Sequence, residues 1–292
     1  MKLSIIIDCL QSQTFKDFEA IFVVDKHLTE IGEFVSKDAR ISFISNLNSI
    51  FRSKRDANDP KIGGNASQLR NYGIKAAKGE FILLLDDDNL FDNDYLEKYF
   101  QFRDIHRKHI GKDFVLCPTL MYRKTGQVQN YGFSHFNYWM SRPEAAKMGD
   151  KERINVQMFS GNSLLAPAYL FKEHLFDERL DFVAEDLDFT RGISSAGIPI
   201  IVLRDLHNYH MESDKDTLQQ ARVGNEYAAY RKAKHRRIFV KKYASWTDKI
   251  KFALLGIWGQ SGRLGLKVLL FGKGRPRWKI IWAIIKGTFC KI

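Results

Sequence analysis

The sequence predicts an α/β protein with a mainly parallel central sheet flanked by helices, followed by a helical basic tail. The first observation is that short apolar runs end in acidic residues, as in "FEAIFVVD" (18–25) and "EFILLLDDD" (80–88). Such runs are typical of strands that are buried on both faces of a parallel sheet. The second is the intervening segment "ASQLRNYGIKAAKGE" (66–80), which has helical spacing and a Lys-Gly stop signal. Strand, helix and strand in alternation indicate right-handed crossovers.

The first apolar run, "LSIII" after Lys2, fits either a strand or the start of a helix. The other elements, assigned by the same criteria, are strands at 41–45, 113–123 and 198–203, helices at 92–111, 163–176 and 186–197, and a loop-rich segment at 125–160.

The charge is distributed unevenly along the chain. Residues 231–292 hold 17 Lys and Arg against one acid, Asp248, whereas the remaining 29 basic and 33 acidic residues give 1–230 a charge of −4. This asymmetry predicts two parts, a domain over 1–230 and a basic helical tail over 231–292. With 292 residues, 45% of them hydrophobic, the chain is long enough to bury a large core.

The cysteines and the N-terminal run indicate a reducing compartment. Cys9, Cys117 and Cys290 are scattered and form no CxxC or Cys/His spacing, so neither a disulfide framework nor a thiolate metal site is expected. The apolar run after Lys2 is too short for a signal peptide, and Asp8 follows it in place of a small-residue cleavage site. We therefore expect a cytoplasmic protein.

The apolar run at 80–88 ends in three adjacent carboxylates, Asp86, Asp87 and Asp88. Ligands of open α/β sheets bind outside the carboxyl ends of the strands, so these acids are expected at a site. Their mutual repulsion is relieved by a divalent cation, and oxygen ligands favour Mg²⁺ or Mn²⁺. The alternative is that Asp88 and Asn89 cap the next helix while the other acids face water.

Three segments then carry a family resemblance. In this order, "QTFKDFEAIFVVD", "NASQLRNYGIKAAKGEFILLLDDDN" and "FDERLDFVAEDLDFTRGISSAGIPI" resemble the family 2 glycosyltransferases, inverting enzymes with the nucleotide-sugar-binding GT-A fold. The match covers about 8–205. It implies that Asp86 and Asp88 are the two acids of the DXD motif, with Asp88 holding Mn²⁺ or Mg²⁺ against the diphosphate and Asp86 near the ribose. Asp87, between them, is expected to point away or to support the turn.

The resemblance also implies the other nucleotide-sugar contacts. Asp25 matches an acid that contacts the nucleobase. Asn65 and Arg70 fall in the segment between the base-binding strand and the DXD motif, where Arg70 is placed to contact base or phosphate. His207 and His210 follow the strand after the ED helix, in a region where some metal-dependent relatives place a histidine near the diphosphate or the metal. A structural or exposed histidine is the more common case; of the two, His210 is the candidate for metal or phosphate contact.

The segment "AEDLDF" matches the ED motif of that family. The resemblance makes Asp186 the catalytic base, with Glu185 beside it. The role is chemically reasonable, because an inverting transfer needs a carboxylate that takes the proton of the acceptor hydroxyl. The alternative is that both acids only stabilise a helix N-terminus through the macrodipole.

The sequence departs from the family pattern at two places. The family begins with a strand of the form "VSIIIPTYN" followed by a long helix, whereas here "SIII" runs directly into "DCLQSQTF". If "IDCLQSQTF" aligns with the first helix, the first strand is missing; if "LSIII" is that strand, the helix is shortened. The second departure follows the base-binding strand, where "DKHL" replaces the family's "DDGS" and keeps only Asp25.

The basic tail alternates cations with aromatic and aliphatic patches. Trp278, Ile281, Trp282 and Ile285 share one helical face, which is typical of a helix lying in a membrane interface. No uncharged stretch reaches the roughly 20 residues that a transmembrane helix needs. A helix packed on the catalytic domain is the alternative, and the aliphatic density argues against nucleic-acid binding.

These observations predict an inverting, Mn²⁺- or Mg²⁺-dependent glycosyltransferase at the cytoplasmic face of the membrane. It would move a sugar from a nucleotide diphosphate sugar to a glycan or lipid-linked acceptor in cell-surface polysaccharide synthesis. Two other readings are a degenerate, inactive membrane scaffold of the same fold and a nucleotidyltransferase. The latter should carry a Gly-rich, basic phosphate loop near its N-terminus, which the sequence lacks.

Overall fold

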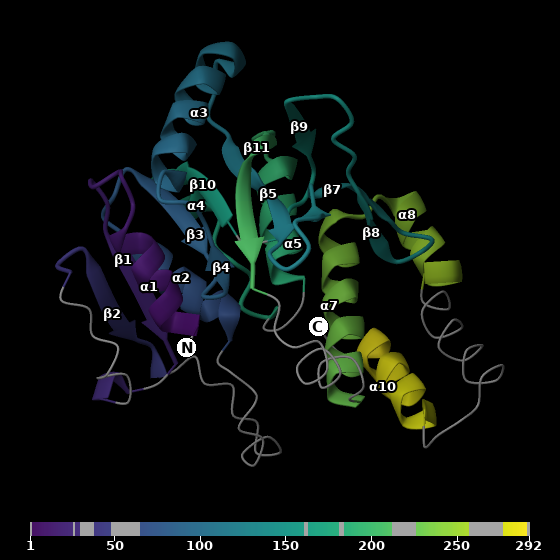
Figure 1. Cartoon of the computed structure of the whole chain (residues 1–292). Coiled ribbons are helices and arrows are strands. Elements are labelled where there is room, and N and C mark those ends of the chain that lie inside the picture. Colours follow the sequence, from purple (N-terminus) through teal and green to yellow (C-terminus); the bar gives the residue numbers. More distant parts are fainter. Residues whose placement is uncertain are drawn as a thin grey trace. The chain divides into compact units, whose positions relative to one another are not determined.

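The computed structural model describes residues 2–25, 27–29, 38–47, 65–160, 163–180, 184–211, 226–256 and 277–290. The chain forms two compact units (Figure 1). The first unit consists of Met1–Gly132, Ala146–Asp181 and Glu185–Met211, and the second of Phe133–Ala145, Phe182–Ala184 and Glu212–Ile292. The boundary predicted at 230/231 falls within helix α7 (Glu226–Tyr243) of the second unit.

The helices of the first unit are α1 (Lys2–Gln11), α2 (Ala66–Ala76), α3 (Tyr95–Ile110), α4 (Ala168–Glu173) and α5 (Glu185–Ser195). Its strands are β1 (Ala20–Val24), β2 (Ile41–Ser45), β3 (Phe81–Leu85), β4 (Asn89–Leu90), β5 (Val115–Tyr122), β6 (Val128–Asn130), β9 (Arg153–Val156), β10 (Ser163–Pro167) and β11 (Ile200–His210).

A seven-stranded sheet forms the centre of the first unit. Its order is β3-β10-β5-β11-β4, with β6 paired to β5 and β9 to β11. β11 is parallel to β5, whereas β10 runs antiparallel to both of its neighbours and β4 is antiparallel to β11. β1 and β2 form a separate parallel pair. The expected mainly parallel sheet is therefore mixed, while the α/β architecture is as predicted.

The helix expected over 163–176 is wrong in its first part, where the structure has the strand β10. Ser163 to Ala166 are buried between β3 and β5, and the helix α4 begins only after Pro167. A short apolar run fits a buried strand and a buried helix equally well, so periodicity could not separate them. The loop-rich expectation for 125–160 is also wrong, because four short strands, β6 to β9, lie there. Each spans only three to five residues, too few for an alternating pattern to show.

The N-terminal apolar run forms a helix and not a strand. Residues Lys2–Gln11 form α1, and Ile6, Ile7 and Leu10 are buried on one side of it. Their spacing of one, three and four residues places them on a single helical face. Of the two alignments that the sequence left open, the structure therefore has the helix and not the strand at "LSIII".

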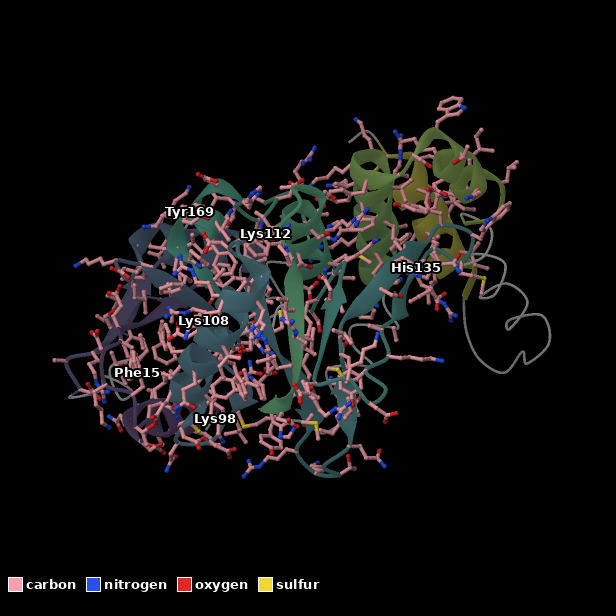
Figure 2. All side chains as sticks on the ribbon, turned by 90° about the horizontal axis from the view of Figure 1, so that it is seen from above. Phe15, Lys98, Lys108, Lys112, His135 and Tyr169 are labelled. Carbon is pink, nitrogen blue, oxygen red and sulfur yellow. The ribbon has the colours of Figure 1, made fainter. Side chains whose placement is uncertain are left out.

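Helices cover both faces of the central sheet, and the side chains of its strands alternate between two apolar layers. Val115 and Cys117 of β5 pack in one layer, with α2, α4 and α5, while Leu116 packs in the other, with α1 and α3. β10 and β11 alternate in the same way. This double burial explains why the strands read as continuous apolar runs. Lys108 and Lys112, at the end of α3, are exposed (Figure 2).

The described part of the second unit contains a two-stranded antiparallel sheet and a helical part. The sheet joins β7 (Phe133–Asn137) to β8 (Arg142–Ala145). The helical elements are α7, α8 (Trp246–Lys251), the π-helical turn η3 (Phe252–Gly256) and α10 (Arg277–Phe289). α10 lies along α7 (Figure 1).

The packing of α10 against α7 depends on a glycine. A Cβ atom at Gly287 would overlap the carbonyl oxygen of Tyr230 and lie 3.0 Å from the Cβ of Ala233. Ala283, Ile284 and Thr288 are buried on the same side of α10. The two helix backbones therefore approach more closely than any larger residue would permit.

We expect Gly287→Ala to destabilise the second unit by about 1 to 3 kcal/mol, because overpacking outweighs the gain of about 1 kcal/mol in helix propensity. All five tryptophans belong to this unit, so urea unfolding followed by tryptophan fluorescence measures it. Lys279→Ala, at an exposed position of the same helix, is the control and should leave the midpoint unchanged. Equal midpoints for both variants would contradict the close packing.

Candidate active site

The three aspartates form a turn at the carboxyl end of β3. The strand ends at Leu85, Asp86 follows it, and Asp87 and Asp88 lie in the turn before β4. The buried side chain of Asn89 donates from Nδ2 to the carbonyl oxygen of Asp86 over 3.0 Å and so closes the turn. Asp87 is exposed, while Asp86 and Asp88 are half-buried. The turn therefore separates Asp87 from the other two acids, as the sequence predicts.

The end of β11 brings His210 to this turn. β11 pairs with β4 through His210 and Asn89, and the backbone N–H of Met211 donates to the carbonyl oxygen of Asp88 over 2.8 Å. As a result, Nε2 of His210 lies 3.2 Å from Oδ2 of Asp88. His207 lies three residues earlier on the strand, and side chains alternate between faces, so it projects to the other side. The structure thus brings together Asp88 and the histidine favoured from the sequence.

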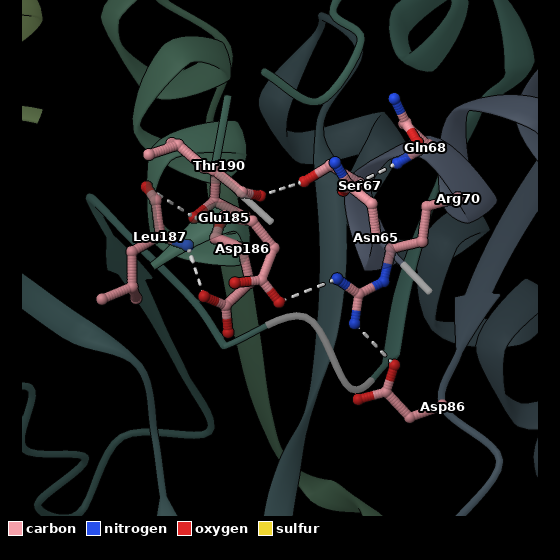
Figure 3. Close-up of polar contacts among 10 residues, drawn as sticks. Asn65, Ser67, Gln68, Arg70, Asp86, Glu185, Asp186, Leu187 and Thr190 are labelled. Carbon is pink, nitrogen blue, oxygen red and sulfur yellow. Dashed lines mark hydrogen bonds and ion pairs between the residues drawn. The ribbon is translucent and has the colours of Figure 1, made fainter. Parts of the chain in front are cut away.

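Arg70 of α2 connects the two acidic clusters (Figure 3). One guanidinium nitrogen donates to Oδ1 of Asp86 over 2.8 Å, and another donates to Oε1 of Glu185 over 3.1 Å. Burial disfavours the charge of Arg70, but the carboxylates of Asp86, Glu185 and Asp186 outweigh that effect and raise its pKa above the usual value. Arg70 is therefore permanently charged, and two of its nitrogens bind carboxylates.

Glu185 and Asp186 occupy the first turn of α5. Oδ1 of Asp186 accepts from the N–H of Leu187 over 2.8 Å, and its carbonyl oxygen accepts from Oγ1 of Thr190 over 2.8 Å. Negative charge in this turn is favoured by the helix macrodipole. Ala184, immediately before it, has φ of 70°, a left-handed conformation that costs a non-glycine residue about 1 to 2 kcal/mol. Such strain is concentrated at functional sites.

α2 also fixes the segment that leads to these acids. The Nδ2 of Asn71 donates to the carbonyl oxygen of Phe176 and its Oδ1 accepts from the N–H of the same residue, at 2.9 and 2.8 Å. Oγ of Ser67 donates to the carbonyl oxygen of Leu180. Asn65 is buried, caps α2 through the N–H of Gln68, and donates to the carbonyl oxygen of Glu178, so a nucleotide contact there would compete with these bonds.

A hollow lies at the carboxyl ends of β1 and β2, where Asp25 follows β1. It has a volume of about 580 Å³, and the residues that line it are His27, Leu28, Thr29, Ser45, Asn46, Leu47 and Tyr72. Tyr72 comes from α2, two residues after Arg70, because α2 packs over β1 with Gly73 against Val23. The half-buried Asp25 is not among the lining residues.

The candidate metal ligands fit an ion that takes few ligands from the protein. Among the described residues, no three His, Cys, Asp or Glu side chains form a cluster that could hold a metal. The pair of Asp88 and His210 supplies one carboxylate and one imidazole. Mg²⁺ and Mn²⁺ keep several waters and take further ligands from phosphates, so two protein ligands are compatible with either ion.

Several residues of this site carry no signal in the sequence. Asn71 and Ser67 read as ordinary polar positions of a helix, although they bind a segment more than 100 residues away. The positive φ of Ala184 depends on its surroundings and not on its side chain. The tyrosine at 72 fits the apolar pattern of α2 as a core residue, yet it is 43% exposed in the hollow.

Comparisons with known proteins agree on one family. Residues 20–239 match the model described as "Glycosyltransferase like family 2". An uncharacterized glycosyltransferase of Rickettsia bellii is 26% identical over 228 residues, which cover 72% of this chain and 27% of that protein. The glycosyltransferase GlyG of Streptococcus pneumoniae is 24% identical over 189 residues, covering 59% of this chain and 54% of the relative. The chain thus spans between about a quarter and a half of these relatives.

Solved structures share the fold at low sequence identity. The S. aureus TarS 1-349 structure in complex with UDP-GlcNAc superposes with a TM-score of 0.58 at 18% identity, covering 97% of this chain and 76% of that one. GalNAc-T7 with UDP, GalNAc and Mn²⁺ gives a TM-score of 0.60 at 12% identity, covering 96% of this chain and 50% of that one.

Replacing Arg70 with methionine should lower the free energy of unfolding by about 2 to 4 kcal/mol, because two partly buried carboxylates lose their partner. The loss is smaller than for full burial, since the Asp86 side chain is 28% exposed. Urea unfolding followed by circular dichroism measures the loss, and faster hydrogen exchange at the start of α5 locates it. The control is Lys98→Met, which removes a more exposed pair with Asp94 and should cost at most about 0.5 kcal/mol. Equal losses would show that Arg70 is an ordinary surface cation.

Proposed function

The chain belongs to glycosyltransferase family 2, and we propose that it transfers a sugar from a nucleotide diphosphate sugar to a hydroxyl of a glycan or lipid-linked acceptor, with inversion at the anomeric carbon. The GT-A fold predicted from the sequence is confirmed by the structural neighbours. The observation that carries the proposal is the double ion pair of Arg70, which joins the turn after β3 to the start of α5. A donor-binding turn and an acidic helix start therefore belong to one site.

Asp186 is the proposed general base. Its carboxylate takes the proton of the acceptor hydroxyl while the hydroxyl oxygen forms a bond to the anomeric carbon. The bond from that carbon to the diphosphate oxygen breaks on the opposite face, and the diphosphate leaves with the electron pair. The hydrogen bond from the N–H of Leu187 fixes one carboxylate oxygen of Asp186. Glu185, held by Arg70, positions the helix start and does not itself take the proton.

The charge of the site supports a divalent cation. Arg70 carries one positive charge against the carboxylates of Asp86, Glu185 and Asp186, so the cluster keeps a net negative charge. An anionic diphosphate would be repelled by such a cluster. Asp88 and His210, with Asp86 nearby on the turn, would hold Mn²⁺ or Mg²⁺, which supplies charge neutralisation for the leaving diphosphate.

The nucleoside is proposed to bind at the ends of β1 and β2. The hollow there is large enough for a planar base, and Tyr72 offers an exposed aromatic face for stacking. Asp25, directly after β1, is the proposed acceptor for a donor group of the base. Asn65 contributes indirectly, because it caps the helix that carries both Arg70 and Tyr72.

The basic tail is proposed to attach the protein to the inner face of the cell membrane, where a lipid-linked acceptor for cell-surface polysaccharide would be presented. Its 17 lysines and arginines against one acid favour an anionic lipid surface. None of the helices in the described ranges has the length and apolar character needed to cross a bilayer. Nucleic acid is not a proposed partner.

Asp186→Asn should reduce transfer by about 10² to 10⁴-fold, because the amide cannot accept the proton. Donors are first screened as a panel of nucleotide diphosphate sugars with and without Mn²⁺, and calorimetry then checks that nucleotide binding persists in the variant. The control is Asp94→Asn, which removes an acid at the start of α3, outside the site. Undiminished turnover of the Asp186 variant would remove the base assignment. Failure of every nucleotide to bind the wild type would favour the inactive scaffold.

Asp88→Asn should weaken the Mn²⁺-supported binding of a nucleotide diphosphate by about 10- to 100-fold, as expected when a metal-site group is lost. Asp87→Asn should have a much smaller effect, because the Asp87 side chain is exposed on the turn. Calorimetry with Mn²⁺ and again with a chelator separates a metal-mediated effect from a direct contact. If the Asp88 variant binds the nucleotide more weakly than wild type by the same factor in the chelator as with Mn²⁺, Asp88 does not act through a metal.

A further inference from the structure

A line of large apolar side chains is exposed along α8 and η3 of the second unit. Trp246, Ile250 and Leu254 are 77%, 43% and 60% exposed. They are spaced four residues apart, so they lie on one side of the helix. We propose that this line, the α8 stripe, docks on bilayers that contain anionic lipid.

The opposite side of the same segment is anchored inside the unit. Phe252 is buried with Val240 and Ala244 of the α7 end, and Phe136 and Tyr138 pack against this cluster. Oγ of Ser245 caps α8 by accepting from the N–H of Asp248 over 3.2 Å. The helix is therefore fixed by the side that carries Phe252, and none of the three stripe residues belongs to that buried cluster.

The charge beside the stripe fits an anionic surface. Lys249 is exposed on α8, which carries part of the stripe, and Lys241 is exposed on α7, which precedes α8 in the chain. Asp248 is the single acid of residues 231–292, and its carboxylate is held by Lys251 over 2.8 Å and by the hydroxyl of Ser245 over 2.7 Å. The end of α7 and α8 thus present Lys241 and Lys249 beside the stripe, and cations close to a bilayer add attraction to anionic lipid.

α10 has a second exposed face of the same kind. Trp282 and Phe289 are 58% and 69% exposed, and the ammonium group of Lys286 lies 5.7 Å from the Trp282 ring. The sequence predicted that Ile281, Trp282 and Ile285 share one helical face. In the structure Trp282 points outward, whereas Ile281 and Ile285 are half-buried. The remaining side of α10 packs on α7, so this helix too is held inside the unit while it presents apolar and cationic groups.

The chemistry favours a lipid surface over a macromolecular partner. Tryptophan with aliphatic residues and lysine is the composition of interfacial helices, where the rings lie at the headgroup level and the cations meet phosphates. A nucleic-acid surface would present aromatic rings for stacking and cations along a groove, and isoleucine and leucine have no role there.

The inference rests on the membrane attachment included in the proposed function and names the surface responsible. It does not depend on the transfer reaction. The variant is Trp246→Ser, Ile250→Ser and Leu254→Ser together; all three positions are exposed, so the fold is retained. The matched control is Ile105→Ser, Val128→Ser and Leu175→Ser, three exposed apolar residues of the first unit with exposures of 51%, 39% and 38%.

Flotation of the full chain with vesicles of phosphatidylcholine, with and without added phosphatidylglycerol, is the test. We expect wild type and control to float with the anionic vesicles, and the α8 variant to bind them about tenfold or more weakly, since the apolar contribution is lost. Donor binding, measured by calorimetry on the same samples, should be equal in all three proteins. Circular dichroism confirms that each is folded.

The outcomes separate this inference from the rest of the proposal. Equal flotation of the α8 variant and wild type would overturn the surface and leave membrane attachment intact. A wild type that fails to float with either vesicle would overturn both, while the transfer reaction would stand on its own assay. A wild type that is dimeric by sedimentation, absent from vesicles and made monomeric by the α8 substitutions would show that the stripe binds a second copy instead.

Discussion

The ion pairs of Arg70 are the interaction on which the candidate site depends. They hold together two groups of carboxylates that come from elements about a hundred residues apart in the chain, the turn after β3 and the start of α5. At an effective dielectric of 20, a pair of unit charges 4 Å apart gains about 4 kcal/mol before desolvation is subtracted. Arg70 makes two such pairs with one guanidinium group, because its N–H donors point toward two acids in different directions. A lysine has one charge centre and could not span both.

The same helix performs a second task, and this explains why its polar residues are buried. α2 delivers Arg70 to the acids, and through Asn65, Ser67 and Asn71 it also binds the backbone of residues 176–180. Each of these side chains satisfies backbone groups that would otherwise be buried without a partner, at a cost of about 1 to 3 kcal/mol each. The position of Arg70 and the path of the chain toward Asp186 are therefore set by one rigid element. A shift of α2 would move Arg70, Tyr72 and the segment that leads to Asp186 together.

Sequence reasoning succeeded where one short-range pattern decides the structure and failed where distant contacts do. The apolar runs that end in acids gave β1, β3 and their acids at the strand ends, because burial on both faces leaves a continuous apolar signature. His210, a candidate for metal or phosphate contact from the sequence, lies 3.2 Å from Asp88, and its role stays a prediction. In contrast, β10 was taken for a helix, because its position between β3 and β5 is decided by pairing partners far away in the chain. The two hydrogen bonds between Asn71 and the backbone of Phe176 likewise depend on contacts that form only in the folded chain. The same holds for the backbone conformation of Ala184.

The two parts of the chain carry net charges of opposite sign, and each part is proposed to bind a different anionic partner. Residues 1–230 carry a charge of −4, although the proposed donor is an anionic diphosphate. Arg70 does not offset this, since it already binds Asp86 and Glu185, and for this reason a divalent cation is proposed beside Asp88. A lipid surface is anionic as well, and residues 231–292, which hold 17 lysines and arginines against Asp248 alone, are proposed to supply the attraction to it. Fixed cations at the active site would bind the released diphosphate as firmly as the donor, whereas an ion with few protein ligands takes its remaining ligands from the diphosphate and can leave with it. In the proposed function, the segregation of charge thus serves lasting attachment at one surface and turnover at the other.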